Sequence, residues 1–408
     1  MAAAAVVLFS CGSKGFRTDD LGVKVSSEEN REYSYTDKKA GYWYGRTHAE
    51  AAEWYSGWNM AKKRILADYT LSVDGNILDR SEAECTVYPD RLVRKWDNAV
   101  ETFRMMDNLP IIYIALESDS DATSITLDRS LISDSYKAGD VEFFIPGEAP
   151  DKRIMLAGDG AKGFVLTYGT EDECRTLHQE FLAHGEELIK ERKARINALV
   201  AEYNPVKTNL PELDRALDWI TITMDELITE QQGNGIYAGL PWFNEYWGRD
   251  MFISMPGACL VTGQFEVAKK ILKDFAPDMV IGTGGYVSGP IVLQAAKMGI
   301  KTAIHEQNAF AGVTTKLLSK KVDRIMLTVK ETKNLDQSVM SKVVVTGLPV
   351  RKAFEKKSRV DAKTELGFSE NEICIMSSGG SLGSQVLNEN IARLLKWYQD
   401  NNIKVNHV

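Results

Sequence analysis

The first part of the chain shows short apolar runs separated by turn residues, a pattern typical of a β-rich domain. Three such runs are residues 71–73, 111–116 and 163–168, with Asp, Gly, Pro and Ser between them. Runs of this length and spacing predict antiparallel strands and suit a sandwich. We therefore expect residues 20–168 to form a β-rich domain, with one helix over residues 47–64, where Ala, Glu, Trp and Met are frequent.

The spacing of apolar residues changes to a helical period after residue 168. Apolar side chains recur at three-, four- and seven-residue intervals over residues 171–202, which predicts a long helix that ends before Asn204-Pro205. The same period predicts a second helix over about 210–230 and a third over about 251–273. The region 169–272 is therefore expected to be helical.

The last third of the chain alternates between strand and helix signals. Short β-branched runs occur at residues 279–281, 302–304, 343–345 and 373–376, and a helix is expected over 385–400. Strands that alternate with helices predict a parallel sheet with crossover connections. The whole chain is therefore expected to be multidomain, with an α/β part after the β-rich and helical parts.

Composition and charge support a soluble chain whose net charge changes sign near residue 273. The 408 residues carry a net charge of −8, which argues against general nucleic-acid binding. From residue 273 onward there are 19 Lys and Arg against 13 Asp and Glu, a net of +6, while the first 272 residues hold 30 against 44, a net of −14. This contrast suggests two sequences of different origin joined near that residue.

The five cysteines are scattered, and no pair has metal-ligand spacing. Without a CxxC pair or a nearby His, the sequence predicts neither a metal site nor a disulfide framework, and buried free thiols are the simplest interpretation. Cys11 differs because it follows a short apolar stretch, and Leu8–Cys11 resembles the lipobox of bacterial lipoproteins. Residues 1–19 are thus either a truncated lipoprotein signal, which would mean export, or a terminus without targeting meaning.

An aromatic loop over residues 236–250 is the first candidate for function. It contains Trp242, Trp247, Arg249 and Asp250. Aromatic rings stack on the CH faces of sugars, while charged side chains hydrogen-bond the hydroxyls. These four residues are candidates for sugar binding, and the alternative is a packed loop with a structural Arg249–Asp250 pair.

Residues 20–272 resemble the glycogen debranching enzyme (amylo-α-1,6-glucosidase) family, through residues 211–219, the loop and residues 260–272. The resemblance implies a β-rich domain before a six-hairpin helical toroid, with α-glucan as ligand. It places Arg249 and Asp250 on a pair that holds a terminal glucose. The family's key acidic residues lie in toroid helices that this chain does not reach. Because inverting hydrolysis needs two carboxylates, we expect no glucosidase activity here.

Two glycine-rich turns in the last third each follow a predicted strand and open a predicted helix. Glycine permits tight turns, and the N–H groups at a helix start can hold an anion. Two such units suggest a phosphate or nucleotide ligand, and the alternative is ordinary turns. The residues of interest are Gly282, Gly284, Gly285, Ser288 and Gly289 in the first turn, and Gly380, Ser381 and Gly383 in the second.

Polar residues also follow two of the other predicted strands. Residues 305–308, His-Glu-Gln-Asn, come directly after one strand, and Arg351 follows another. The carboxyl ends of parallel strands meet at one edge of the sheet, so these side chains are candidates for ligand contact. A structural His305 and a solvated Arg351 are the alternatives.

Residues 281–290, 305–308, 346–351 and 379–384 resemble, in order, the MurG family of bacterial GlcNAc transferases. The resemblance covers residues 273–408 and implies the two-domain GT-B fold with Rossmann-like halves. It implies inverting transfer of GlcNAc from UDP-GlcNAc to undecaprenyl-pyrophosphoryl-MurNAc-pentapeptide, in peptidoglycan synthesis at the cytoplasmic face of the inner membrane. UDP-GlcNAc would be the donor substrate, with no cofactor and no metal.

Carried over residue by residue, this resemblance assigns donor and acceptor positions. Residues 273–340 would be the second half of the acceptor-side domain, with the first glycine turn as its second glycine loop, and 341–408 the start of the donor domain. The family's first glycine loop has no counterpart, and the chain stops inside a strand. Leu348 stands where the family usually has Asn, and His305 is the first candidate for a base. The donor-binding positions are Asn308, Arg351, Ser381, Gly380 and Gly383.

Three interpretations follow from the sequence. The first is a MurG-type transferase that is truncated and inactive as this chain. The second is a debranching-like, carbohydrate-active protein, anchored by lipid. The third is a non-functional fusion of two gene fragments, joined within residues 268–277, which read plausibly in both families.

Overall fold

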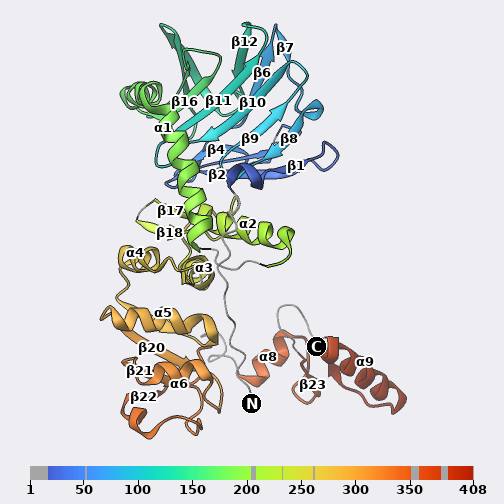
Figure 1. Cartoon of the computed structure of the whole chain (residues 1–408). Coiled ribbons are helices and arrows are strands. Elements are labelled where there is room, and N and C mark those ends of the chain that lie inside the picture. Colours follow the sequence, from blue (N-terminus) through green and yellow to red (C-terminus); the bar gives the residue numbers. More distant parts are fainter. Residues whose placement is uncertain are drawn as a thin grey trace.

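The protein consists of a sheet-rich part, a helical part and an α/β part, in sequence order (Figure 1). The structure is a computed structural model, and it describes residues 17–50, 53–203, 208–231, 233–260, 262–350, 358–377 and 385–407. The lipobox-like Cys11, Arg351 and the turn that contains Gly380, Ser381 and Gly383 lie outside the described residues.

Three antiparallel sheets make up the sheet-rich part. The spatial order of the largest is β1 (Val23–Val25), β8 (Glu84–Val87), β9 (Leu92–Lys95), β10 (Ala99–Met105), β11 (Ile111–Ser118), β16 (Phe164–Gly169), β15 (Arg153–Gly158), β14 (Val141–Pro146) and β13 (Ile132–Ala138). The second contains β2 (Glu32–Thr36), β3 (Gly41–Arg46), β4 (Gly57–Met60) and β5 (Lys63–Leu66). The third contains β12 (Thr123–Leu127), β6 (Tyr69–Val73) and β7 (Asn76–Ile77).

One hydrophobic core is shared by the three sheets. Trp43 of β3, Leu71 of β6 and Phe103 of β10 are fully or almost fully buried in it. The ring centroids of Trp43 and Phe103 lie 5.2 Å apart. The core therefore joins strands that are distant in sequence, and it confirms that residues 20–168 are rich in strands.

The helix expected over residues 47–64 is wrong. Residues 57–60 and 63–66 form β4 and β5, and β4 pairs with β3. Gly57 has a φ of +93°, and a Cβ there would lie 2.0 Å from the carbonyl oxygen of Leu66. Trp58 is fully buried in the shared core. Burial of the strand thus outweighs the helical propensity of Ala, Glu and Met in this segment.

The helical part confirms the first two predicted helices and corrects the third. Helix α1 spans Glu171–Tyr203, and α2 spans Pro211–Leu227 before a hairpin of β17 (Ile228–Glu230) and β18 (Asn234–Ile236). The single helix expected over 251–273 is instead α3 (Gly248–Met255), a π-helical turn (Pro256–Leu260) and α4 (Phe265–Phe275). Gly263 has a φ of +80°, which a continuing helix does not allow.

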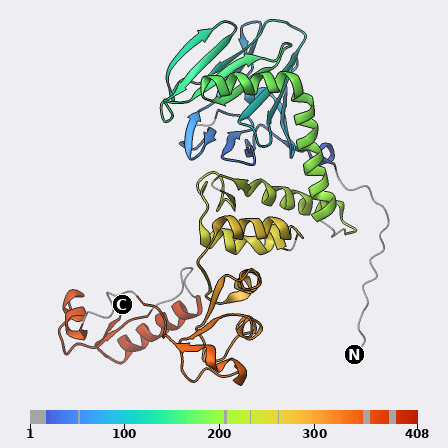
Figure 2. The same cartoon turned by 90° about the vertical axis from the view of Figure 1, so that its left-hand side faces the viewer.

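Buried ion pairs connect the sheet-rich part to α1 and α2. Arg192 of α1 is 2% exposed, and its guanidinium pairs with Asp107, which follows β10, and with Glu226 of α2. Arg195 of α1 pairs with Asp107 and with Asp225 of α2. Figure 2 shows α1 running from the sheets to the helices below them. These contacts fix α1 against both parts.

The α/β part contains the predicted parallel sheet. Its strand order is β19 (Met279–Gly282), β20 (Lys301–Glu306), β21 (Arg324–Leu327) and β22 (Val343–Val345), all parallel. Helix α5 (Gly285–Lys297) connects β19 to β20, and α6 (Val313–Ser319) connects β20 to β21. Strand β21 was not predicted from the sequence. Its apolar run is the three residues Ile325–Leu327, of which Ile325 and Leu327 are buried and Met326 is half-buried.

The last described elements form a separate small unit. Strand β23 (Cys374–Ile375) pairs in parallel with β24 (Asn406–His407), and α8 (Arg359–Glu365) precedes them. Helix α9 spans Gln385–Asp400, as the sequence predicts, although no residue of it is buried. The strand expected over residues 373–376 is present with two residues.

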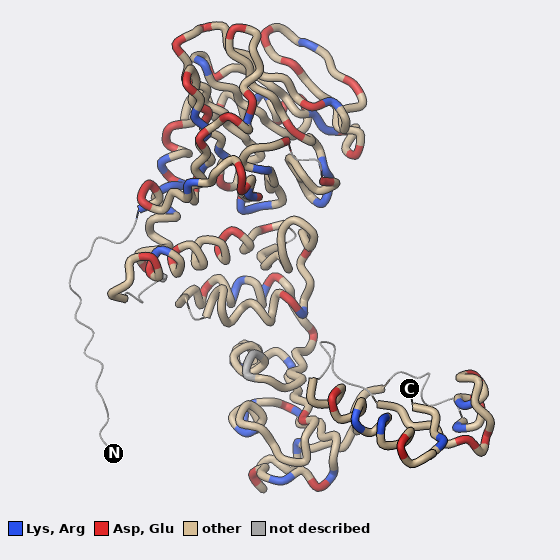
Figure 3. The backbone as a smooth tube through the Cα atoms, turned by 90° about the vertical axis from the view of Figure 1, so that its right-hand side faces the viewer, with Lys and Arg blue, Asp and Glu red and all other residues tan. Residues whose placement is uncertain are grey.

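The described cysteines agree with the sequence-based interpretation of free thiols. Cys85, Cys174 and Cys259 are buried free thiols, and Cys374 is half-buried and also free. Burial raises the pKa of Cys85 and of Cys174 to about 11, so both stay protonated at neutral pH. Figure 3 shows acidic and basic residues interspersed over the described chain.

Candidate functional site

The glycine turn between β19 and α5 lies at the carboxyl edge of the parallel sheet. Gly284 has a φ of +99°, and a Cβ there would lie 2.9 Å from Oε1 of Gln307. A Cβ on Gly282 would lie 2.9 Å from a methyl group of Val292 in α5. Both positions therefore require glycine, one for backbone conformation and one for close packing. The turn brings the first residues of α5 next to the end of β20.

The remaining residues of this turn lie at the start of α5. Gly285 has a φ of +75°, and a Cβ there would meet nothing within 4 Å. The Ser288 hydroxyl donates to the Gly285 carbonyl at 3.1 Å, and Gly289 faces Thr314 of the neighbouring helix α6. Ser288 therefore ties the turn to the first helical turn, and a Cβ on Gly289 would make ordinary contact with Thr314, at 3.5 Å.

His305 connects the ends of three strands. It is 6% exposed, and its Nε2 lies 3.1 Å from the Gly347 carbonyl oxygen beyond β22. Its Nδ1 lies 3.1 Å from Nε2 of Gln307, which also donates to the Thr283 carbonyl after β19 at 2.6 Å. A His305 that is protonated on Nε2 satisfies both contacts. Because both ring nitrogens have partners, this geometry favours a structural role, and a role as base stays a prediction.

Glu306, the last residue of β20, is buried and accepts four hydrogen bonds. Oε1 accepts from the backbone N–H and the Nδ2 of Asn308, and Oε2 accepts from the Gly312 N–H and the Thr315 hydroxyl. Burial by itself would raise the pKa of Glu306, but these hydrogen bonds outweigh it and lower the pKa. The carboxylate therefore stays ionised at neutral pH and shapes the segment from Asn308 to Gly312.

The polar residues predicted at the sheet edge are brought together. The Thr283 carbonyl, His305, Gln307 and the Gly347 carbonyl form one chain of hydrogen bonds across β19, β20 and β22. Asn308 lies on the exposed end of this group. The edge therefore presents a hydrogen-bonded scaffold with a solvent-facing amide, an arrangement suited to holding a polar ligand.

The four predicted sugar-binding residues are exposed or half-buried. Trp242 is 53% exposed with its ring 5.7 Å from Tyr55, and Trp247 is 48% exposed beside Phe243. Arg249 and Asp250 pair with each other at 3.3 Å.

Arg249 lies beside the glycine turn. A pocket of about 490 Å³ is lined by Arg249 and Phe252 of α3 and by residues 282–285, with parts of β19 and α5. The pocket therefore brings one predicted sugar-binding residue next to the predicted anion-binding turn.

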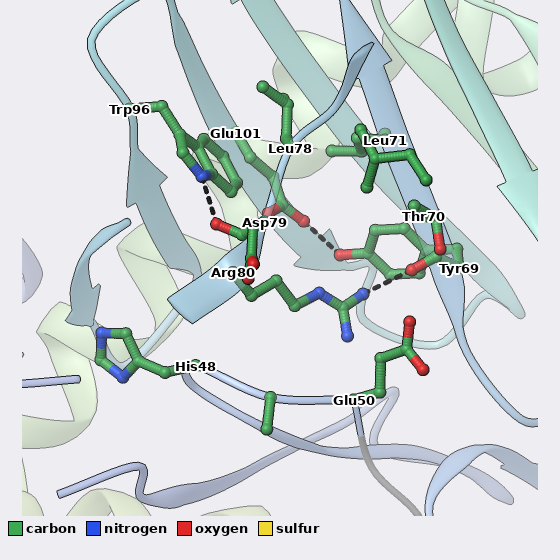
Figure 4. Close-up of a pocket in the computed structure, with 12 residues that line it drawn as sticks. His48, Glu50, Tyr69, Thr70, Leu71, Leu78, Asp79, Arg80, Trp96 and Glu101 are labelled. Carbon is green, nitrogen blue, oxygen red and sulfur yellow. Dashed lines mark hydrogen bonds between the residues drawn. The ribbon is translucent and has the colours of Figure 1, made fainter. Parts of the chain in front are cut away.

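A second pocket lies in the sheet-rich part (Figure 4). It measures about 450 Å³, and Arg80 extends into it beside Glu101 and Tyr69. Glu101 accepts from the Tyr69 hydroxyl and from Arg94, while Arg80 donates to both oxygens of Asp68 at 2.8 Å. These charged groups pair with one another, so the contacts are explained by structure. These pairs were not predicted from the sequence, although a Glu at an inward position of the alternating strand β10 is a usable signal.

Among the residues that the structure describes, no group of three or more His, Cys, Asp or Glu could hold a metal ion. No helix within the described ranges is long and apolar enough to cross a membrane.

Comparison with known families places the α/β part near glycosyltransferases. A family model described as "Glycosyltransferase family 28 N-terminal domain" matches residues 223–327. These residues run from within α2 to the end of β21, so they contain the glycine turn and residues 305–308. The C-terminal region of the chain therefore resembles MurG-type proteins, as its motifs indicate.

Curated relatives support the same resemblance to MurG-type proteins. The chain is 46% identical over 129 residues to the UDP-N-acetylglucosamine–N-acetylmuramyl-(pentapeptide) pyrophosphoryl-undecaprenol N-acetylglucosamine transferase of Acetivibrio thermocellus, covering 32% of this chain and 35% of that protein. It is 48% identical over 128 residues to the enzyme of the same name from Finegoldia magna, covering 30% and 33%. The chain thus spans about a third of the length of these relatives.

A solved structure of MurG from Acinetobacter baumannii is 35% identical to the chain. The match covers 31% of this chain and 33% of that one, with a TM-score of 0.22. The resemblance of residues 20–272 to debranching enzymes stays a prediction.

Proposed function

We propose that this chain carries part of a MurG-type glycosyltransferase, an inverting hexosyltransferase that uses UDP-GlcNAc. The acceptor would be undecaprenyl-pyrophosphoryl-MurNAc-pentapeptide, in peptidoglycan synthesis. The observation that supports this most is the identity of 46% over 129 residues to a transferase of that name. The matched family segment includes the sheet edge with the glycine turn and residues 305–308.

The proposed roles follow the sheet edge. Residues 282–289 form the acceptor-side glycine loop of a GT-B fold, where N–H groups at the start of α5 face an anion. Asn308 contacts the donor from the exposed end of the hydrogen-bonded scaffold. The remaining donor contacts are assigned to Arg351, Ser381, Gly380 and Gly383.

The chemistry of the two substrates sets the partners and the place of action. UDP-GlcNAc is the donor, no cofactor is needed, and a lipid-linked acceptor keeps the reaction at the cytoplasmic face of the membrane. The N-terminal lipoprotein signal is the competing proposal for localisation, because it would place the chain outside the cytoplasm.

A transfer assay tests the function. The purified chain and the Acetivibrio thermocellus relative are each incubated with UDP-GlcNAc and a lipid I analogue. Alignment of two substrates accounts for about 7–11 kcal/mol of a barrier, and this chain matches about a third of the relative. We therefore expect turnover at least about a thousand-fold lower than that of the relative. Turnover equal to that of the relative would contradict the proposal of an incomplete site.

Donor binding tests the assigned residues separately from turnover. Arg351→Ala and Ser381→Ala should each weaken the binding of UDP in calorimetry, because each removes a group assigned to the pyrophosphate. Lys352→Ala, next to Arg351, serves as the control for a general loss of positive charge. Unchanged UDP binding in both variants would remove these two residues from the donor site.

A second proposal concerns residues 20–272, which we assign to a debranching-like carbohydrate-binding part. The exposed Trp242 and Trp247 favour it, because large aromatic side chains on a surface are typical of sugar contacts. Retention of the chain on an immobilised α-glucan, lost in Trp242→Ala, tests this proposal. Sequencing single DNA molecules across codons 260–290 tests whether the two parts are a real fusion.

A further inference from the structure

Glu306 occupies a buried position between the sheet edge and α6. Its side chain is 3% exposed, and all four of its hydrogen-bond partners are donors. Two of them belong to Asn308, at 3.0 Å from the backbone nitrogen and 2.9 Å from Nδ2. The other two, Gly312 at 2.9 Å and Thr315 at 2.7 Å, contact the second carboxylate oxygen.

An acceptor-only partner determines which way the Asn308 amide faces. An ionised carboxylate accepts hydrogen bonds and donates none, so the NH2 group of Asn308 must face Glu306. The side-chain oxygen Oδ1 then faces away from Glu306. Asn308 is exposed, so this oxygen is the atom that its side chain presents to a ligand at the sheet edge.

We infer that Glu306 is a positioning residue that holds Asn308 with Oδ1 outward, so that position 308 recognises a hydrogen-bond-donating group of the donor sugar. Such a group is a hydroxyl or the acetamido N–H. The inference rests on the proposed function, since it takes UDP-GlcNAc as the ligand. It adds the direction of the hydrogen bond and the residue that fixes this direction.

The competing explanation is that Glu306 only stabilises the start of α6. Its Oε2 atom contacts Gly312 and Thr315, which lie at that helix start. A stabilising role of this kind would affect UDP and UDP-GlcNAc binding equally. A positioning role affects only the contact with the sugar.

The experiment is a double-mutant cycle on the intact chain. UDP and UDP-GlcNAc are titrated by calorimetry into the wild type, Glu306→Ala, Asn308→Ala and the double variant. We expect each single variant to lower the UDP-GlcNAc affinity, relative to UDP, about tenfold, the value of one good hydrogen bond. The double variant should lose no more than either single variant, because both remove the same contact.

Thr315→Val is the matched control. It removes a hydrogen bond from the other oxygen of Glu306 and leaves both contacts with Asn308 in place. Its ratio of UDP-GlcNAc to UDP affinity should equal that of the wild type. If Glu306→Ala does not fold, Glu306→Gln replaces it, because it keeps the volume and offers one acceptor oxygen to four donors. Its ratio should fall in the same direction.

The outcomes separate the two claims. Additive losses in the double variant, or equal losses for UDP and UDP-GlcNAc, overturn the positioning role while the proposed function stands. A ratio of UDP-GlcNAc to UDP affinity that is unchanged in the Glu306 variants also overturns the positioning role, and the proposed function stands. A wild-type chain that binds neither ligand overturns the proposed function, and this inference with it.

Discussion

At the scale of single residues, Asp37 carries the largest pH sensitivity that we expect in the sheet-rich part. It is almost fully buried, and its Oδ1 accepts from the N–H groups of Lys39 at 2.8 Å and Gly41 at 2.9 Å. Burial raises the pKa of Asp37 to about 7, although these two hydrogen bonds oppose the shift. The folded state therefore holds a proton at pH 5 that an unfolded Asp, with a pKa of about 3.9, has released.

This difference in bound protons determines whether stability rises or falls with pH. Because the folded state binds more protons than the unfolded state between about pH 4 and 7, stability falls as the pH rises through that range. Asp37→Asn keeps an acceptor oxygen and cannot ionise, so its free energy of unfolding should change less between pH 5 and 8. Urea unfolding followed by Trp fluorescence measures this, since seven of the eight Trp lie before residue 273.

Asp79→Asn is the control for the Asp37 prediction. Asp79 is exposed, and hydrogen bonds from Ser81 lower its pKa, so it stays ionised throughout the measured range. Its replacement should leave the pH dependence between pH 5 and 8 unchanged. If the free energy of unfolding of Asp37→Asn depends on pH as strongly as that of the wild type, Asp37 is already ionised at pH 5.

Part of the candidate site could be predicted from the sequence at the scale of single residues. The glycines at 282 and 284 and the polar residues 305–308 were identified from their position after predicted strands. The buried role of Glu306 was not, because whether a side chain at a strand end turns inward depends on the following loop. The Arg94–Glu101 pair was missed for a similar reason, since partners on different strands have no fixed spacing in sequence.

At the scale of secondary-structure elements, the end of α4 contains a strained residue. Ala276 has a φ of +44° and a ψ of +55°, and its N–H donates to the Leu272 carbonyl at 3.2 Å. Glycine adopts this left-handed conformation without the steric cost that a Cβ imposes. Ala276→Gly should therefore stabilise the chain by about 0.5–1 kcal/mol, measured as a higher urea midpoint.

The control for Ala276→Gly is a glycine in the middle of the same helix. Lys270 is exposed within α4, so Lys270→Gly should destabilise by roughly 1 kcal/mol. A loss of stability in both variants would mean that the left-handed conformation of Ala276 does not destabilise the end of α4.

Elements with a regular pattern were predicted well, and elements set by tertiary contacts were not. Helices α1 and α2 follow from the spacing of their apolar residues. Strand β4 does not, because Gly57 and Trp58 are placed by the neighbouring strand and by the shared core. Similarly, the break between α3 and α4 depends on Gly263, whose positive φ is not determined by local pattern.

At the scale of the whole molecule, the buried ion pairs of Arg192 hold the sheet-rich part to the helices. Removing one partner of a buried pair leaves uncompensated charge and typically costs about 3–5 kcal/mol. Arg192→Met should therefore destabilise the chain by an amount of that order, because Asp107 and Glu226 lose a partner.

Arg175→Met is the control on the same helix. Arg175 pairs with Glu171 across one turn of α1 at a half-exposed site, and such pairs contribute about 0.3–0.5 kcal/mol. Urea unfolding of both variants compares the two sites directly. Equal effects would show that the Arg192 network contributes no more than a surface ion pair.

The α/β part and the sheet-rich part differ in the evidence that each binds a ligand. The α/β part carries the transferase resemblance, and the sheet-rich part carries a pocket whose charged groups pair internally. A nucleotide-sugar site should therefore lie in the α/β part and not in the sheet-rich part.

Hydrogen–deuterium exchange of the intact chain, with and without UDP-GlcNAc, tests this claim most directly. We expect slower exchange in peptides that cover the donor-side residues 305–312, 346–351 and 380–383, and no change over residues 17–203. The same experiment with UDP should protect fewer of the residues around 308. Protection confined to the sheet-rich part, or absent from the whole chain at saturating UDP-GlcNAc, would contradict the account.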